Sequence, residues 1–181
     1  MSVIAYVKKD NKITVASDGL AVSGSTIKGT EVKKVGCIGK EVLYGVTGLV
    51  DSIEMFENFI KLNIKRFTRI YYTTDVLKLM NEFKEYCISE YGYTDDYIKE
   101  FGTFMIVTKC WRCFVCFDEE NGNVPYIVDD NLEHAVAGCK HEYIEALLDI
   151  GYDIETAIKI AAKKCIHIND KVTTYTLDLN I

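Results

Sequence analysis

The hydrophobic periodicity of this chain changes four times between the alternation of β-strands and the repeat of α-helices, and this order constrains the fold most. The expected elements are strands over 3–9, 12–17, 32–38 and 41–46, helices over 51–67 and 75–91, strands over 104–109, 113–117, 126–128 and 134–137, helices over 142–150 and 154–168, and a strand over 172–179. Two sheets packed face to face, each with a helix pair outside it, would bury these apolar faces. We predict an α+β fold, a four-layer αββα sandwich, in a single domain over 1–181.

Local signals support these boundaries. The expected turns are Asp10-Asn11, Gly39-Lys40 and Glu119–Asn123. The candidate helix N-caps are Asp51 or Ser52, Thr74 and Asp153, and Gly151 is a candidate C-terminal glycine.

Composition and charge argue against several classes of function. Apolar residues make up 49% of the 181 positions and charged residues 27%, as in soluble globular proteins. The net charge is −6 and no basic run exceeds two residues, so nucleic acid is not an expected partner. No stretch approaches the roughly 18 apolar residues of a membrane span. The seven cysteines lack a framework spacing, so we expect free thiols and a cytoplasmic location.

Four features of the first fifty positions suggest a site for chemistry. Ser2 precedes the first strand, Asp18-Gly19 follows the second, Lys33-Lys34 lies in the third, and Gly45 lies in the fourth. Each feature has an ordinary structural explanation, because Asp-Gly forms turns, strand lysines face solvent, and a strand glycine can mark a bulge. Their combination, in this order of elements, is what indicates function.

In this combination the chain resembles the proteasome β-type subunits and HslV-like peptidases, a family of N-terminal-nucleophile hydrolases. The resemblance covers nearly the whole chain and is densest in "ITVASDGLAVSGSTIKGTEVKKV", "EVLYGVTGLVDSIEMFENF", "AVAGCKHEYIEALL" and "CIHIN". The spacing from Asp18-Gly19 to Lys34 matches the family without a gap, whereas the middle of the chain matches only in pattern. The resemblance implies a protease with a polypeptide substrate and self-association into rings with inward-facing sites.

The family's nucleophile falls on Ser2 when residues are counted back from Asp18-Gly19. Removal of Met1, which a small second residue permits, would expose Ser2 with a free α-amine. An α-amine has an ordinary pKa of about 7.7–8.0, against about 10.4 for lysine, so it is partly neutral near pH 7–8. It can therefore take the proton of the Ser2 hydroxyl, whereas a peptide nitrogen cannot. Removal of Met1 is thus the expected activating step.

The resemblance implies catalytic roles for four further residues. Lys34 takes the position of the active-site lysine, whose charge would disfavour protonation of the α-amine and stabilise a developing alkoxide. Asp18 takes the position of the aspartate that keeps the lysine charged and oriented. Gly45, in "YGVTG", matches the glycine whose N–H forms the oxyanion hole. Cys139 stands where the family often has a serine that supports the α-amine.

Departures from the family pattern leave other functions open. The nucleophile is serine rather than threonine, and Cys139 is a weaker hydrogen-bonding group than serine. The further aspartate and serine of proteasome subunits are missing near "CIHIN", where Asn169 and Asp170 could bind a cation or cap a helix. The alternatives are a non-catalytic structural ring subunit and a related small-molecule amidohydrolase.

Other motifs carry weaker signals. "CWRCFVC" contains a CxxC pair, Cys110 and Cys113, but residues three apart in a strand face opposite sides, so buried or edge thiols are favoured over zinc. The scattered histidines are His134, His141 and His167, and we expect them to be structural. We expect no cofactor. No GxxxxGK[ST] motif is present, so any ATP dependence would belong to a partner, an ATP-dependent unfoldase.

The helix expected over 51–67 predicts assembly. Its apolar residues are Ile53, Met55, Phe56, Phe59, Ile60, Leu62, Ile64 and Phe67. Together they give the helix more apolar surface than one narrow stripe facing the sheet requires. We therefore expect Met55 and Leu62 to face outward and to contact other subunits. We therefore predict a homo-oligomer of at least six chains.

Overall fold

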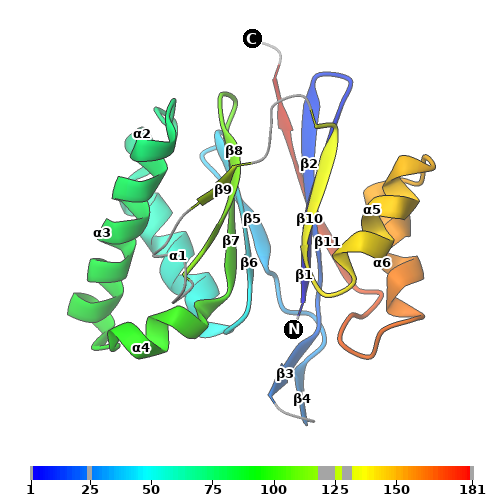
Figure 1. Ribbon diagram of the computed structural model, residues 1–181, viewed down its shortest axis with the longest axis horizontal. Coiled ribbons are helices and arrows are strands. Elements are labelled where there is room, and N and C mark those ends of the chain that lie inside the picture. The colour runs from blue at the N-terminus through cyan, green and yellow to red at the C-terminus, as the bar shows by residue number, and fades with distance from the viewer. Residues whose placement is uncertain (1, 24–25, 118–124, 128–131, 180–181) are drawn as a thin grey trace.

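The computed structural model describes residues 2–23, 26–117, 125–127 and 132–179, and two antiparallel sheets form its centre (Figure 1). The first sheet has the strand order β10 (His134–Gly138), β1 (Val3–Lys9), β2 (Lys12–Asp18) and β11 (Val172–Asp178). The second has the order β5 (Val35–Ile38), β6 (Val42–Thr47), β7 (Thr103–Val107), β8 (Arg112–Cys116) and β9 (Pro125–Ile127). A separate ribbon consists of β3 (Ala21–Ser23) and β4 (Thr26–Gly29).

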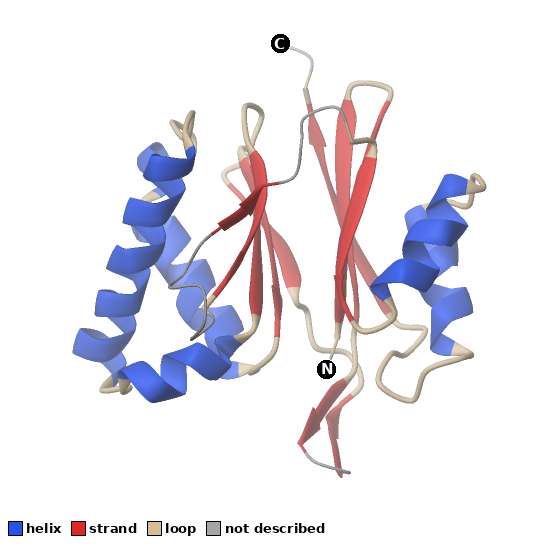
Figure 2. Cartoon of the chain, viewed as in Figure 1, coloured by secondary structure: helices blue, strands red, loops and turns tan. Residues whose placement is uncertain are grey.

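Helices cover the outer face of each sheet and complete four layers (Figure 2). The β5–β9 sheet carries α1 (Asp51–Leu62), α2 (Ile64–Phe67), α3 (Thr73–Tyr91), α4 (Asp95–Ile98) and the short 3₁₀ helix Lys99–Phe101. The other sheet carries α5 (His141–Asp149) and α6 (Ile154–Ala162). The predicted αββα sandwich is confirmed. None of the helices in the described ranges has both the length and the apolar character needed to cross a membrane.

Three apolar clusters fill the spaces between the four layers. The cluster between the sheets includes Ile4, Tyr6, Val15, Leu43 and Met105. The cluster under α1 and α3 is built around aromatic rings, including Phe56, Phe59, Phe83 and Phe104. The cluster under α5 and α6 is aliphatic and includes Ile144, Leu147 and Ile158. Because strand side chains alternate between faces, Ile4 lies between the sheets whereas Val3 packs toward the helices.

Both predicted hairpin turns are confirmed by their backbone angles. Asp10 and Asn11 have φ of 50° and 57°, and Gly39 and Lys40 have φ of 62° and 58°. Two consecutive residues with positive φ are typical of the two-residue hairpin turns that match the twist of paired strands. The first hairpin sets the register of β1 on β2, in which Ile4 lies opposite Ser17. The predicted turn Glu119–Asn123 lies outside the described residues.

The structure corrects several predicted boundaries. The strand expected over 32–38 begins only at Val35, and the β3–β4 ribbon was not predicted. The helix expected over 51–67 ends at Leu62, and Asn63 separates it from α2. The helix expected over 154–168 ends at Ala162. Apolar residues continue past both ends, which is why periodicity alone extended these helices too far.

The capping predictions have mixed outcomes. Asp153 caps α6 as predicted, because its carboxylate accepts a hydrogen bond from the Thr156 backbone N–H at 2.9 Å. The prediction of Thr74 as a cap is wrong, since α3 already begins at Thr73 and Asp75 binds the preceding backbone. At α1 the cap position is Val50, and no side chain caps the helix.

The predicted outward face of the first helix is wrong at one of its two positions. Met55 is only 2% exposed and belongs to the aromatic core, whereas Leu62 is 71% exposed. Helix α1 contacts both the sheet and α3, and Phe67 is fully buried from its place on α2. The chain's own core therefore takes up most of the apolar surface that had indicated subunit contacts.

Candidate active site

The backbone of Ser2 is held at the beginning of β1, at the end of the space between the sheets. Ser2 is 5% exposed, and its carbonyl oxygen accepts a hydrogen bond from the Cys139 N–H at 2.7 Å. Because Ile4 and Tyr6 point into the core between the sheets, the period of a strand directs the Ser2 side chain toward the same space. The hydroxyl has no hydrogen-bond partner among the residues that the structure describes.

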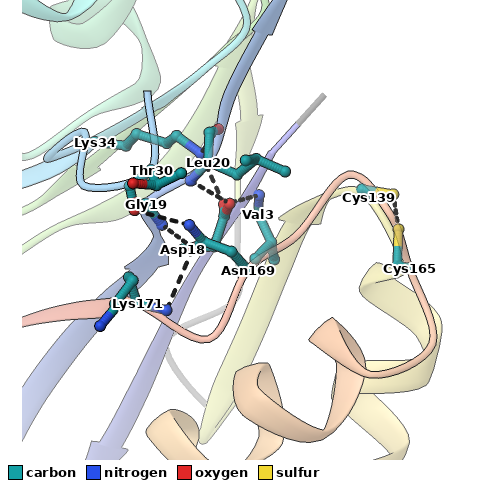
Figure 3. Close-up of polar contacts among 10 residues, drawn as sticks. All are labelled: Val3, Asp18, Gly19, Leu20, Thr30, Lys34, Cys139, Cys165, Asn169 and Lys171. Atoms are coloured by element: carbon teal, nitrogen blue, oxygen red, sulfur yellow. Dashed lines mark hydrogen bonds and ion pairs between the residues drawn. The ribbon is translucent and has the colours of Figure 1, made fainter. Parts of the chain in front are cut away.

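The carboxylate of Asp18 connects the backbone beside Ser2 to a buried lysine (Figure 3). One oxygen, Oδ1, accepts from the Val3 N–H at 3.1 Å and from Lys34 Nζ at 2.9 Å. The other oxygen, Oδ2, accepts from the Leu20 N–H at 2.9 Å. Asp18 is fully buried and Lys34 is 2% exposed, so this ion pair is shielded from solvent. The sequence prediction that Asp18 orients Lys34 has a direct geometric basis.

Lys34 lies immediately before β5, in a segment that is not part of a strand. Its Nζ also donates to the Leu20 carbonyl at 2.6 Å, so two of the three ammonium N–H groups have partners in the described chain. Burial lowers the pKa of Lys34, and the charge and hydrogen bond of Asp18 oppose this effect. The third N–H of the ammonium group has no partner among the described residues.

Asn169 holds the turn that follows Asp18. Its Oδ1 accepts from the Gly19 N–H at 2.9 Å and from the Lys171 N–H at 3.3 Å, and its Nδ2 donates to the Thr30 carbonyl at 2.8 Å (Figure 3). A Cβ on Gly19 would lie 2.8 Å from the Thr30 oxygen, so only glycine fits there. Asn169 therefore joins three segments, a role that the sequence analysis missed because the partners are far apart in the chain.

Gly45 does not have the location expected of an oxyanion-hole donor. It lies inside β6, opposite Val35 of β5 and Met105 of β7. The Val46 N–H donates to the Lys34 carbonyl on the β5 side, so the alternation of an antiparallel ladder directs the Gly45 N–H into the pairing with β7. The small size of Gly45 has a packing reason, since a Cβ would lie 2.8 Å from Met105 Cε and 3.3 Å from Ile4 Cγ2.

Gly48, just after β6, is better placed. Its φ is +116°, which favours glycine, and the alternation along β6 directs its N–H to the same side as that of Val46, toward Lys34. A Cβ on Gly138 would lie 3.3 Å from Thr47 Cγ2 and 2.1 Å from the Ser2 carbonyl, so the end of β6 adjoins Ser2. Among the described residues, the Gly48 N–H has no hydrogen-bond acceptor. Gly45 and Gly48 both lie in the segment "YGVTG", so the sequence motif contained this second candidate as well.

Cys139 contacts Ser2 through its backbone rather than its side chain. Its N–H holds the Ser2 carbonyl, while its Sγ lies 3.1 Å from the Sγ of Cys165 (Figure 3). Burial, followed by the hydrogen bond with Cys165, raises the pKa of the Cys139 thiol to about 11. The thiol is therefore neutral near pH 7.

The remaining cysteine and histidine candidates form no hydrogen bond with Ser2, Asp18 or Lys34 in the described part of the chain. Cys110 is exposed, and Cys113 is buried on β8 under the aromatic cluster. Within the described ranges, no group of three His, Cys, Asp or Glu side chains could hold a metal ion. His134 lies 3.3 Å from Asp149, and His141 contacts the Gly138 carbonyl at 3.2 Å.

Comparison with known proteins identifies the fold. No family model matches the chain, and no curated protein matches its sequence. The solved structure of HslV from Trypanosoma brucei matches with a TM-score of 0.67 and 15% identity, over 97% of this chain and 99% of that one. BPH of Thiobacillus denitrificans matches with a TM-score of 0.75 and 13% identity over 98% of each chain. The same protein in complex with epoxomicin gives a TM-score of 0.74 and 13% identity, over 99% of this chain and 100% of that one.

These matches extend over nearly the whole of both chains. The protein therefore has the HslV and proteasome β-type fold, and the resemblance predicted from the sequence is confirmed at the level of architecture.

Proposed function

We propose that this chain is the proteolytic subunit of a self-compartmentalised ring protease, and that it cuts peptide bonds with Ser2 after Met1 is removed. The observation that carries the proposal is the Asp18 carboxylate, whose Oδ1 binds both the peptide next to Ser2 and the Lys34 ammonium. A buried ion pair costs desolvation energy and adds little net stability. Its presence beside a serine at the end of the core therefore favours a catalytic role for the pair over a purely structural one. Hydrolysis of a fluorogenic peptide by chain lacking Met1, and its absence in chain retaining Met1, tests this.

The proposed reaction uses Ser2 as both nucleophile and base. The neutral α-amine accepts the hydroxyl proton as Oγ attacks the substrate carbonyl carbon, and the protonated amine then passes that proton to the leaving amine. Water hydrolyses the resulting ester with the same amine as base. The charge of Lys34 favours the neutral amine and stabilises negative charge on Oγ. We assign the oxyanion donor to the Gly48 N–H in place of the Gly45 N–H.

Activity should rise with pH through the titration of the α-amine and then fall. Below the pKa of the amine, which the nearby Lys34 charge depresses from about 7.7–8.0, the base is protonated and the hydroxyl is not activated. Above the pKa of Lys34, which burial lowers from its ordinary value of 10.5, the stabilising charge is lost. A pH profile of kcat/KM from 5.5 to 10 checks this. Activity that falls steadily from pH 6 to 8 would contradict an amine base.

A small-molecule amidohydrolase is the less favoured alternative. A hollow of about 730 Å³ lies around Lys8, Asp10, Glu133 and Tyr152. It adjoins the β1–β2 turn, and the length of β1 places it roughly 20 Å from Ser2. A small molecule bound there would not meet the proposed nucleophile.

Self-association into a ring of at least six chains remains part of the proposal. Its support is a group of exposed apolar side chains around the connection from α1 to α3, namely Leu62 at 71%, Tyr71 at 56% and Tyr72 at 69%. Exposed apolar surface of this kind is typical of interaction sites.

Leu62→Glu should therefore convert the assembly into smaller species and lower peptidase activity without unfolding the chain. Sedimentation velocity at micromolar concentration measures the assembly. Ser89→Glu, which adds the same charge to an exposed position at the other end of α3, is the matched control and should leave the assembly intact. Met55→Glu, by contrast, should unfold the chain, because it buries a charge in the aromatic core. A monomer of 20.6 kDa for the unmodified chain would exclude the ring.

A further inference from the structure

The structure contains a pair of thiols in contact next to the proposed nucleophile. The Sγ atoms of Cys139 and Cys165 lie 3.1 Å apart, and a disulfide would require an approach of about 1 Å more. All seven cysteines are described and free, and no other pair of their sulfur atoms lies within hydrogen-bonding distance. The pair is therefore distinct from the CxxC motif, whose Cys110 is exposed and whose Cys113 is buried.

The two thiols belong to segments that hold opposite sides of the site. Cys139 follows β10, and its N–H holds the Ser2 carbonyl at 2.7 Å. Cys165 lies between α6 and β11, in the segment whose Asn169 holds Gly19 behind Asp18. Figure 3 shows the sulfur atoms facing each other from these segments, away from Lys34. A covalent bond here would join the backbone that positions Ser2 to the backbone that positions Asp18.

We propose that Cys139 and Cys165 form a dithiol modification site, which small-molecule disulfides oxidise to a disulfide, and that this bond restrains the backbone that holds Ser2. Cys139 is partly exposed and Cys165 is nearly buried, so the reaction begins at Cys139. The effect on catalysis rests on the proposed function, whereas the formation of the bond does not.

The chemistry balances in two exchange steps. The Cys139 thiolate attacks one sulfur of a small disulfide RSSR, forms a mixed disulfide and releases RS⁻, which takes up the proton that Cys139 lost. Cys165 then loses its proton and attacks the Cys139 sulfur, which releases the second thiol. Two protein thiols are oxidised, one RSSR is reduced to two RSH, and the protein loses two hydrogen atoms. Because burial keeps the Cys139 thiol protonated at neutral pH, the exchange is slow until RSSR accumulates.

The test treats the folded protein with oxidised glutathione and then measures intact mass and disulfide-linked peptides. We expect the loss of two hydrogen atoms and a peptide pair joining Cys139 to Cys165, both reversed by dithiothreitol. The variant Cys165→Ala should form no such link and should keep its basal activity, with Cys165→Ser as the substitute if alanine impairs folding. Cys110→Ser should form the link as the unmodified protein does.

The same samples measure the coupling to Ser2. Oxidation should lower peptide hydrolysis at least fivefold in the unmodified protein, and dithiothreitol should restore it, while Cys165→Ala should not respond. A stable glutathione adduct on Cys139, or a link between other cysteines, would overturn the modification site. A complete Cys139–Cys165 bond with unchanged turnover would overturn its coupling to Ser2. A chain without basal activity would contradict the proposed peptidase, while the mass measurement would still decide whether the bond forms.

Discussion

Ser2→Ala should abolish peptide hydrolysis, with a loss of roughly 10⁴-fold or more in kcat/KM, because alanine has no hydroxyl to attack the substrate carbonyl. This substitution removes the hydroxyl and leaves the other proposed catalytic groups in place. Alanine is small, so removal of Met1 should continue, and the α-amine remains in place. The Ser2 hydroxyl has no partner in the described structure, so the free energy of unfolding should change by no more than about 0.5 kcal/mol.

Ser2→Thr is the informative companion variant. Threonine keeps a hydroxyl and an α-amine on the same residue, so this variant should retain activity. Both variants are compared by progress curves on a fluorogenic peptide, with intact mass confirming that Met1 is absent. Equal activity of Ser2→Ala and the unmodified chain would assign catalysis to another residue.

Lys34→Ala should have the second largest effect, on both activity and stability. Activity should fall to background, because the charge that favours a neutral α-amine is lost. The structure adds a cost that the sequence did not predict. Asp18 is fully buried, and removal of its partner leaves an uncompensated charge, which typically costs about 3–5 kcal/mol. Thermal or urea unfolding should therefore show a strongly destabilised protein.

Two controls separate these effects. Lys33 is exposed, so Lys33→Ala should change stability by no more than about 0.5 kcal/mol and leave turnover unchanged. The double variant Asp18→Asn, Lys34→Met removes both charges and should recover much of the stability of Lys34→Ala without any activity. An inactive Lys33→Ala together with an active Lys34→Ala would show that the catalytic lysine is the exposed Lys33 and not the buried Lys34.

The sequence predicted the parts of the fold that local patterns determine. Strand β1 has the predicted bounds, and both two-residue turns have the positive φ values that their residues favour. The layer arrangement followed from the order of periodicities. Which helix residues face outward was less predictable, and Met55 was assigned to the wrong side because α1 contacts α3 as well as the sheet.

The site was predictable where it depends on spacing and not where it depends on long-range contacts. Asp18 and Lys34 are 16 residues apart and meet as expected from their register. The sequence analysis named Gly45 and did not consider Gly48, because the position of a glycine in a sequence does not reveal the direction of its N–H. Asn169 forms hydrogen bonds with residues that lie 139 and 150 positions away from it in the sequence, and Cys139 and Cys165 are 26 positions apart. No local pattern indicates contacts of this kind.

The most direct test of the central proposal is the site at which a peptide epoxyketone modifies the protein. This inhibitor class presents a ketone and an epoxide, so stable capture requires a hydroxyl and a free amine on one residue, as Ser2 provides once Met1 is gone. Intact mass and tandem mass spectrometry of the treated protein locate the adduct. The proposal predicts one adduct per chain, on residue 2 of chain that lacks Met1, and none on Ser2→Ala. An adduct on any other residue, or an unmodified Ser2 in chain that lacks Met1 and hydrolyses peptide, would contradict it.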